Sequence, residues 1–107
     1  MTLLYLTIDT EHSPGHFRRA GKAARVENFA QSIAGETHDG AAGIFYQMGV
    51  LERHGLRAVF FVDPMPALVW GVEAVADIVG PIVARGHDVQ LHLHSEWLEF
   101  AGVANPL

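Results

Sequence analysis

Two segments in the first two thirds of the chain have the apolar patterns of β-strands. In the first, Leu3 to Glu11, leucine and isoleucine alternate with a second set of side chains that ends in Asp9 and Glu11. The second, Arg57 to Val62, is a continuous apolar run bounded by Asp63, which is typical of a parallel strand buried on both faces. We expect the second strand to be the central one.

A third strand pattern lies near the end of the chain, at residues 86–97. Apolar side chains occupy one face, and the other face carries Gln90, His92 and His94. Glu96 follows where the strand should give way to a loop. Two imidazoles with a carboxylate close behind are a ligand set for a divalent ion such as zinc.

Two segments between these strands have apolar positions at helical spacing. Residues 41–54 form the first, which ends at Gly55. The second spans residues 72–83 and contains Pro81, where a missing N–H should kink or restart the helix. The order strand, helix, strand, helix, strand predicts an α/β fold with three parallel strands and flanking helices.

The connection between the first strand and the first helix has few regular signals. Residues 12–43 are therefore predicted to form a long functional loop with one embedded turn of helix. Its His38 and Asp39 are candidates for substrate binding, although a His-Asp-Gly sequence is also typical of a plain turn. Trp97 offers a similar choice, because it could stack on a sugar ring or pack in the core.

The polar ends of the first and third strands should meet, because sites in parallel α/β folds form at the C-terminal ends of strands. The residues concerned are Asp9, Glu11, His92 and His94. One carboxylate of such a pair can bind a metal while the other acts as general base. A bound zinc lowers the pKa of its water to about 7, which suffices for ester or amide hydrolysis. The opposing interpretation is a solvated strand edge with ordinary turn residues.

Composition narrows the function classes. The chain has 107 residues, 50% of them hydrophobic, a formal net charge of −5 and no cysteine. This length suits a single core, thiolate metal sites are excluded, and the acidic balance makes nucleic acid an unexpected partner. The N-terminus lacks a signal-peptide pattern and no apolar run is long enough for a membrane span, so we expect a cytoplasmic chain.

Three segments resemble motifs of the polysaccharide deacetylase family, also called carbohydrate esterase family 4, and of its allantoinase-like relatives. Residues 7–11 resemble the family's first motif, Thr-Phe-Asp-Asp-Gly. Residues 51–62 are similar to its segment from helix to second strand, and residues 86–96 resemble its His-Ser/Thr-x-x-His motif. The resemblance implies a distorted (β/α)7 barrel in which the first Asp is the catalytic base and an acid with two His holds the metal.

The resemblance can be carried to individual positions. Asp9 matches the catalytic base, and His92 matches the first metal histidine. Thr10 stands where the family has its second Asp, but divergent members place an acid one residue later, where this chain has Glu11. We therefore expect Glu11 to be the acidic metal ligand.

One metal ligand is left open between two residues. Glu96 occupies the position of the family's second histidine, and His94 lies two residues after His92 on the same predicted strand face. Either could complete a site for a divalent metal ion, with zinc expected. Surface or capping roles are expected for the remaining histidines, His12, His16, His54 and His87.

The family barrel needs roughly twice this length. Residues 1–107 are therefore expected to be the N-terminal portion of a single polysaccharide deacetylase-like domain, inactive alone and able to self-associate through an open sheet edge. For the full-length parent we expect a metal-dependent hydrolase that removes an N- or O-acetyl group from a carbohydrate. The alternatives are allantoinase-like hydrolysis of a linear or cyclic amide and a non-catalytic metal- or carbohydrate-binding remnant.

Overall fold

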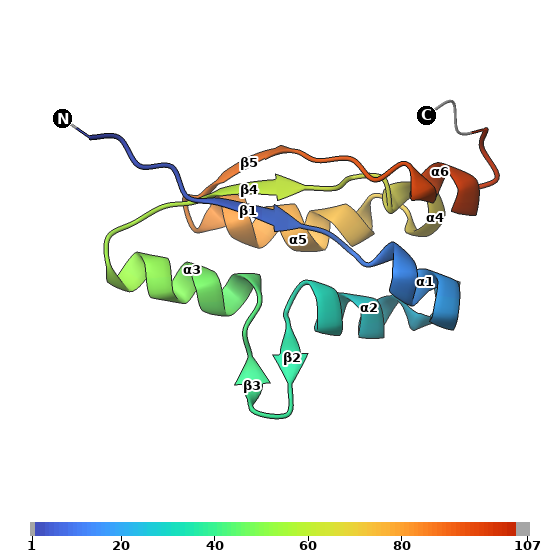
Figure 1. The fold of residues 1–107 in the computed structure, drawn as a ribbon, viewed down its shortest axis with the longest axis horizontal. Coiled ribbons are helices and arrows are strands. Elements are labelled where there is room, and N and C mark those ends of the chain that lie inside the picture. The colour runs from blue at the N-terminus through green and yellow to red at the C-terminus, as the bar shows by residue number, and fades with distance from the viewer. Residues whose placement is uncertain (1, 105–107) are drawn as a thin grey trace.

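A sheet of three parallel strands organises the chain in the computed structural model, which describes residues 2–104 (Figure 1). Its strands are β1 (Thr7–Thr10), β4 (Val59–Val62) and β5 (Asp88–Leu91). A separate antiparallel hairpin consists of β2 (Glu36–Thr37) and β3 (Gly40–Ala41). The helices are α1 (Pro14–Ala20), the 3₁₀ helix η1 (Lys22–Ala24), α2 (Arg25–Ser32), α3 (Ile44–Arg53), α4 (Ala67–Trp70), α5 (Glu73–Ala84) and α6 (Glu96–Phe100).

The strand order in the sheet is β1-β4-β5, and both pairings are parallel. The predicted α/β arrangement of three parallel strands with flanking helices, and the central position of the second strand, are therefore confirmed. β1 and β5 form the two edges of this sheet. Self-association through such an edge stays a prediction.

Helices α3 and α5 cover one face of the sheet. Phe60 of β4 is fully buried against Met48 of α3 and Ile78 of α5, within a core that also includes Ile33, Ile44, Ala58, Val62 and Ile82. The alternate side chains of the strands face the other way, and Asp9 and Gln90 on that face are exposed. The apolar face of the sheet therefore builds the core, and the opposite face remains open.

The first and third strands are shorter than predicted. β1 begins at Thr7, so Leu3, Leu4 and Tyr5 precede it and are exposed, and β5 ends at Leu91. Both pair only with β4, which ends just before Pro64. Because proline has no N–H to continue the ladder, the paired region stops there.

The segment predicted as a long loop is mostly regular, so that prediction was wrong. It contains α1, η1, α2 and the β2–β3 hairpin. Helix α1 starts at a conventional cap, where the Ser13 hydroxyl accepts a hydrogen bond from the backbone N–H of His16 and Pro14 occupies the first turn. The Asn28 side chain of α2 accepts a hydrogen bond from the Ser13 N–H and donates one to the Ser13 carbonyl. These two bonds hold α2 against the start of α1.

Pro81 does not interrupt α5, which runs from Glu73 to Ala84. The expected restart of this helix was therefore wrong. The proline removes the hydrogen bond to the carbonyl of Asp77, but Asp77 is exposed, so water can bind that carbonyl. Among residues 2–104, no helix has the length and apolar character needed to cross a membrane.

Candidate metal centre

The C-terminal ends of the three parallel strands bring one residue from each into a row. Thr10, Val62 and Leu91 are aligned across the sheet. The ladder continues one step further, because the Asp63 N–H donates to the Thr10 carbonyl at 3.2 Å and the His92 N–H donates to the Val62 carbonyl at 3.1 Å. The residues that follow the strands, Glu11, Asp63 and His92, are thus neighbours at one edge, facing α1, α4 and α6 (Figure 1).

Glu11, His92 and His94 bring three potential ligand atoms together. Glu11 Oε2 lies 2.8 Å from His92 Nε2 and 2.6 Å from His94 Nε2. The three ligand atoms all lie within 4.8 Å of one another, and the two imidazole rings are perpendicular, with centroids 4.9 Å apart. Their side chains are 28–31% exposed, so the group is accessible from solvent but largely enclosed.

The short contact between Glu11 and His94 is an ion pair when the histidine is protonated, but it does not have the geometry of a hydrogen bond. Both Glu11 Oε2 and His94 Nε2 are buried atoms with no hydrogen-bond partner in the described part of the chain. Together with His92 Nε2, these atoms are close enough to one another to bind a single cation. One carboxylate and two imidazoles are a donor set that zinc accepts, and other divalent metals share it. The side chains present therefore fit a divalent metal ion.

Glu96 lies behind His94 rather than with the three ligand atoms. Its Oε2 is 3.5 Å from His94 Nδ1, the ring nitrogen opposite the one that faces Glu11. Metal-binding histidines commonly have a carboxylate at their second nitrogen, which fixes the orientation of the ring. Of the two candidates, His94 therefore lies with Glu11 and His92, and Glu96 lies behind its ring.

Asp9 lies on the open face of the sheet, two rows before Glu11. Its backbone is aligned with Phe61 in β4, and its side chain is exposed. It does not belong to the group of three ligand atoms. A carboxylate in this position can reach a molecule bound over the open face.

The three predicted substrate-binding residues do not join this site. His38 and Asp39 are exposed at the turn of the β2–β3 hairpin, which projects away from the strand ends (Figure 1). There the Asp39 N–H donates to the Thr37 hydroxyl at 3.2 Å, as in an ordinary turn. Trp97 is fully buried and packs against Phe17 at a centroid distance of 5.3 Å. Of the two interpretations of Trp97, the structure favours core packing.

Asp63 is a residue of this region that the sequence analysis treated only as the boundary of a strand. Its side chain is completely buried, and Oδ1 accepts a hydrogen bond from the Met65 N–H at 2.9 Å. Burial raises the pKa of the Asp63 carboxyl, whereas the backbone N–H of Met65, the nearby charge of His94 and the backbone N–H of His94 oppose this effect. Its position directly after the central strand was the signal that could have identified it.

The prediction of a surface or capping role for His12 was wrong, because this residue is fully buried. Its ring packs against Trp70 at a centroid distance of 5.1 Å, and neither ring nitrogen has a hydrogen-bond partner within residues 2–104. Burial, followed by the positive charge of Arg25, lowers the pKa of His12 to about 4. His16 and His87 are buried as well.

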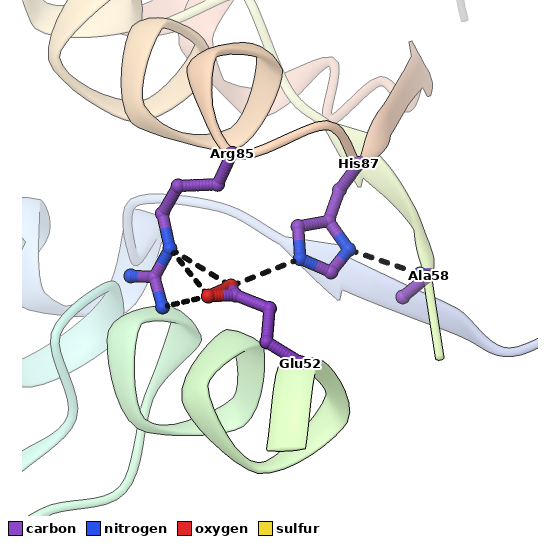
Figure 2. Close-up of polar contacts among 4 residues, drawn as sticks. All are labelled: Glu52, Ala58, Arg85 and His87. Carbon is purple, nitrogen blue, oxygen red and sulfur yellow. Dashed lines mark hydrogen bonds and ion pairs between the residues drawn. The ribbon is translucent and has the colours of Figure 1, made fainter. Parts of the chain in front are cut away.

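A second polar cluster closes the opposite end of the sheet (Figure 2). Arg85 at the end of α5 forms a bidentate ion pair with Glu52 of α3, with a shortest N–O distance of 2.7 Å. The Ala58 N–H donates to His87 Nδ1 at 3.1 Å, and Glu52 Oε2 lies 3.4 Å from His87 Nε2. Because Nδ1 accepts, the neutral ring carries its proton on Nε2, facing Glu52. These contacts join α3, α5 and the sheet.

Comparisons of the chain with family models, curated proteins and solved structures returned no match. The function is therefore argued from the chemistry of the site.

Proposed function

We propose that the chain is part of a metal-dependent hydrolase of the polysaccharide deacetylase type, which removes an N- or O-acetyl group from a carbohydrate. The convergence of Glu11, His92 and His94 at the C-terminal ends of parallel strands is the observation that supports it. The resemblance of the flanking segments to that family agrees with this placement. Zinc is the metal that we propose, because the donor set is one carboxylate and two imidazoles.

A bound divalent ion supplies Lewis acidity, which polarises a carbonyl oxygen and makes water easier to deprotonate. Glu11, His92 and His94 would hold it, while Glu96 fixes the orientation of the His94 ring. Asp9 lies two residues before Glu11 on the open face and would accept the proton that water loses as its oxygen adds to the acetyl carbonyl. The same carboxyl group can return that proton to the departing nitrogen or oxygen, so the proton balance closes.

The open face of the sheet is where we propose that substrate binds. Helices cover only the face that carries the core, and Asp9, Phe61 and Gln90 are aligned across the other face. In the distorted (β/α)7 barrel that the family resemblance implies, this face would line the interior. A site at its C-terminal end would have the usual location for catalysis in a barrel of parallel strands.

Allantoinase-like hydrolysis of a small linear or cyclic amide is the second candidate. The spacing of the histidines supports this second candidate, because it departs from the deacetylase motif. One residue separates His92 from His94, whereas three residues separate the two histidines of that motif. Both reactions add water to a carbonyl carbon. A panel of acetylated sugars and of linear and cyclic amides, assayed on the full parent protein, distinguishes them.

The test of the metal proposal is metal content after loading with zinc, cobalt or nickel, measured by mass spectrometry. We expect one ion per chain in the unsubstituted protein and a large loss in Glu11→Ala and His92→Ala. Asp9→Asn is the matched variant, because it removes a neighbouring carboxylate outside the ligand group. It should keep the metal and lower kcat by about 10²–10⁴-fold in the full parent protein. Absence of bound metal in the folded, unsubstituted chain would contradict the proposal.

A further inference from the structure

Asp63 occupies the middle of the row formed by the residues that follow the three strands. Its backbone N–H extends the ladder to Thr10 of β1, and the carbonyl of Val62 just before it accepts from His92 after β5. Glu11 and His92 are therefore its neighbours across the sheet on either side. The central strand thus places a buried carboxylate between the strands that lead to Glu11 and His92.

The Asp63 carboxylate is buried without a lysine or arginine partner for its charge in the described part of the chain. It is 0% exposed, and Oδ1 accepts a hydrogen bond from the Met65 N–H at 2.9 Å. Oδ2 is buried and finds no hydrogen-bond partner among residues 2–104, where no lysine or arginine forms an ion pair with this carboxylate. A buried carboxylate is costly unless it is paired, so this oxygen indicates that a cationic partner belongs nearby.

Asp63 would act on the metal centre through the loop that carries His94. It lies outside the group of three ligand atoms, so it is not a ligand in this arrangement. The backbone amide of His94 lies beside the Asp63 carboxylate and stabilises its charged form. Asp63 thus links the loop that carries His94 to the end of the central strand, β4.

We propose that Asp63 is a positioning residue of the metal centre, which fixes the loop of His94 and supplies the second negative charge that a divalent ion neutralises. This inference rests on the proposed function. Two carboxylates, Glu11 and Asp63, with two neutral imidazoles balance the charge of a divalent ion. Outer carboxylates of this kind raise the affinity of a metal site by holding its ligands in place.

The experiment measures Co²⁺ affinity and the visible spectrum of the cobalt-loaded chain, with Asp63→Asn as the variant. Asparagine keeps the size of the side chain and an acceptor for Met65, but it removes the charge. We expect Co²⁺ to bind about 10–100-fold more weakly and the cobalt spectrum to change as His94 loses its fixed position. The melting temperature of the metal-free variant should stay equal or rise, because a buried charge without a cationic side-chain partner is removed.

The matched control is Asp88→Asn, which removes one carboxylate from the opposite end of β5, where the side chain is exposed. Its Co²⁺ affinity should stay within about twofold of the unsubstituted chain, because distant exposed sites are independent. If Asp63→Asn does not fold, Asp63→Ser serves instead, since its hydroxyl still accepts from Met65 in a smaller volume.

The outcomes separate this inference from the proposed function. An unsubstituted chain that binds no Co²⁺ or Zn²⁺ would overturn both. Normal binding by the unsubstituted chain together with unchanged affinity and spectrum in the uncharged Asp63 variant would overturn only the role of Asp63. A variant that loses stability without metal but keeps full Co²⁺ affinity would make Asp63 a purely structural residue and would also overturn it.

Discussion

Glu11 Oε2 and His94 Nε2 lie 2.6 Å apart, yet the two buried atoms do not form a hydrogen bond. Two lone pairs held at this distance repel each other unless a cation or a proton lies between them. The three potential ligand atoms therefore lie close together without an ion, and a bound cation would remove an unfavourable contact as well as add favourable ones. Sites preorganised in this way gain affinity because less ordering is needed when the ion binds.

The first prediction is that zinc stabilises the folded chain. A ligand that binds only the native state adds about 2.7 kcal/mol of stability when its concentration is 100 times its Kd. Thermal unfolding with zinc, and again after a chelator is added, should show a rise in Tm that reverses. Glu11→Gln should abolish the rise, whereas Glu27→Gln on an exposed part of α2 should leave it intact. An equal rise in both variants would indicate that zinc binds elsewhere.

The second prediction concerns His12 and acid. Because burial lowers its folded-state pKa from 6.5 to about 4, the unfolded chain takes up a proton at a higher pH than the folded chain does. The neutral, buried His12 ring therefore contributes its full stabilisation of the fold above pH 6.5, and this contribution is lost progressively as the pH falls towards 4. The loss amounts to about 3 kcal/mol by linkage.

The measurement for His12 is chemical unfolding between pH 7.5 and about pH 4 in the presence of a chelator. His12→Phe keeps a ring against Phe29 and Trp70 but cannot take up a proton, so its stability should depend less on pH. His54→Phe is the matched control, because His54 is exposed at the end of α3. If both variants lose stability with the same slope as the unsubstituted chain, His12 does not account for the acid sensitivity.

Much of the candidate site could be predicted because two simple rules operate together. Parallel strands place their C-terminal ends at one edge of a sheet, and alternation along a strand assigns side chains to faces. These rules were sufficient to bring Glu11 together with His92. His94 joins them although β5 ends at Leu91, because the chain after the strand continues past the same edge.

Other features depended on contacts between distant parts of the chain. His12 packs against Phe29 of α2 and Trp70 of α4, which are distant along the chain, and no local pattern reports its burial or that of Asp63. The end of β5 is set by its partner, since β4 stops before Pro64. The start of α1, in contrast, could have been predicted locally, because Ser13 followed by Pro14 is a helix-start signal.

The third prediction concerns the ion pair at the opposite end of the sheet. The Arg85 hydrogen bonds are the main cause that lowers the pKa of Glu52 in the folded chain. A lowered folded-state pKa means that the pair stabilises the fold above the unfolded-state pKa of Glu52 and that this contribution is lost as the pH falls below it. The stability difference between the unsubstituted chain and Glu52→Gln should therefore shrink in acid.

Unfolding curves at neutral and acidic pH measure this difference. Glu73→Gln is a suitable control, since Glu73 is exposed in the first turn of α5 and forms no ion pair within residues 2–104. Because Glu52 is partly exposed, water and salt screen the pair, and added salt should reduce its effect further. A constant difference across the pH range would show that Glu52 acts through packing or through its neutral contact with His87.

The fourth prediction is that Trp97 stabilises the fold and does not bind carbohydrate. Its ring contacts Trp70 at 5.3 Å and Phe100 at 5.4 Å and has no exposed surface, so Trp97→Ala should cost about 3–5 kcal/mol in unfolding free energy. The indole N–H has no hydrogen-bond partner in residues 2–104, so Trp97→Phe loses no hydrogen bond and should be milder. Chemical unfolding compares the stability of the two variants with that of the unsubstituted chain. A selective loss of sugar binding in a stable Trp97→Phe chain would contradict a purely structural role for Trp97. Because α6 follows directly after His94, we also expect Trp97→Ala to weaken metal binding, whereas Trp97→Phe should preserve it.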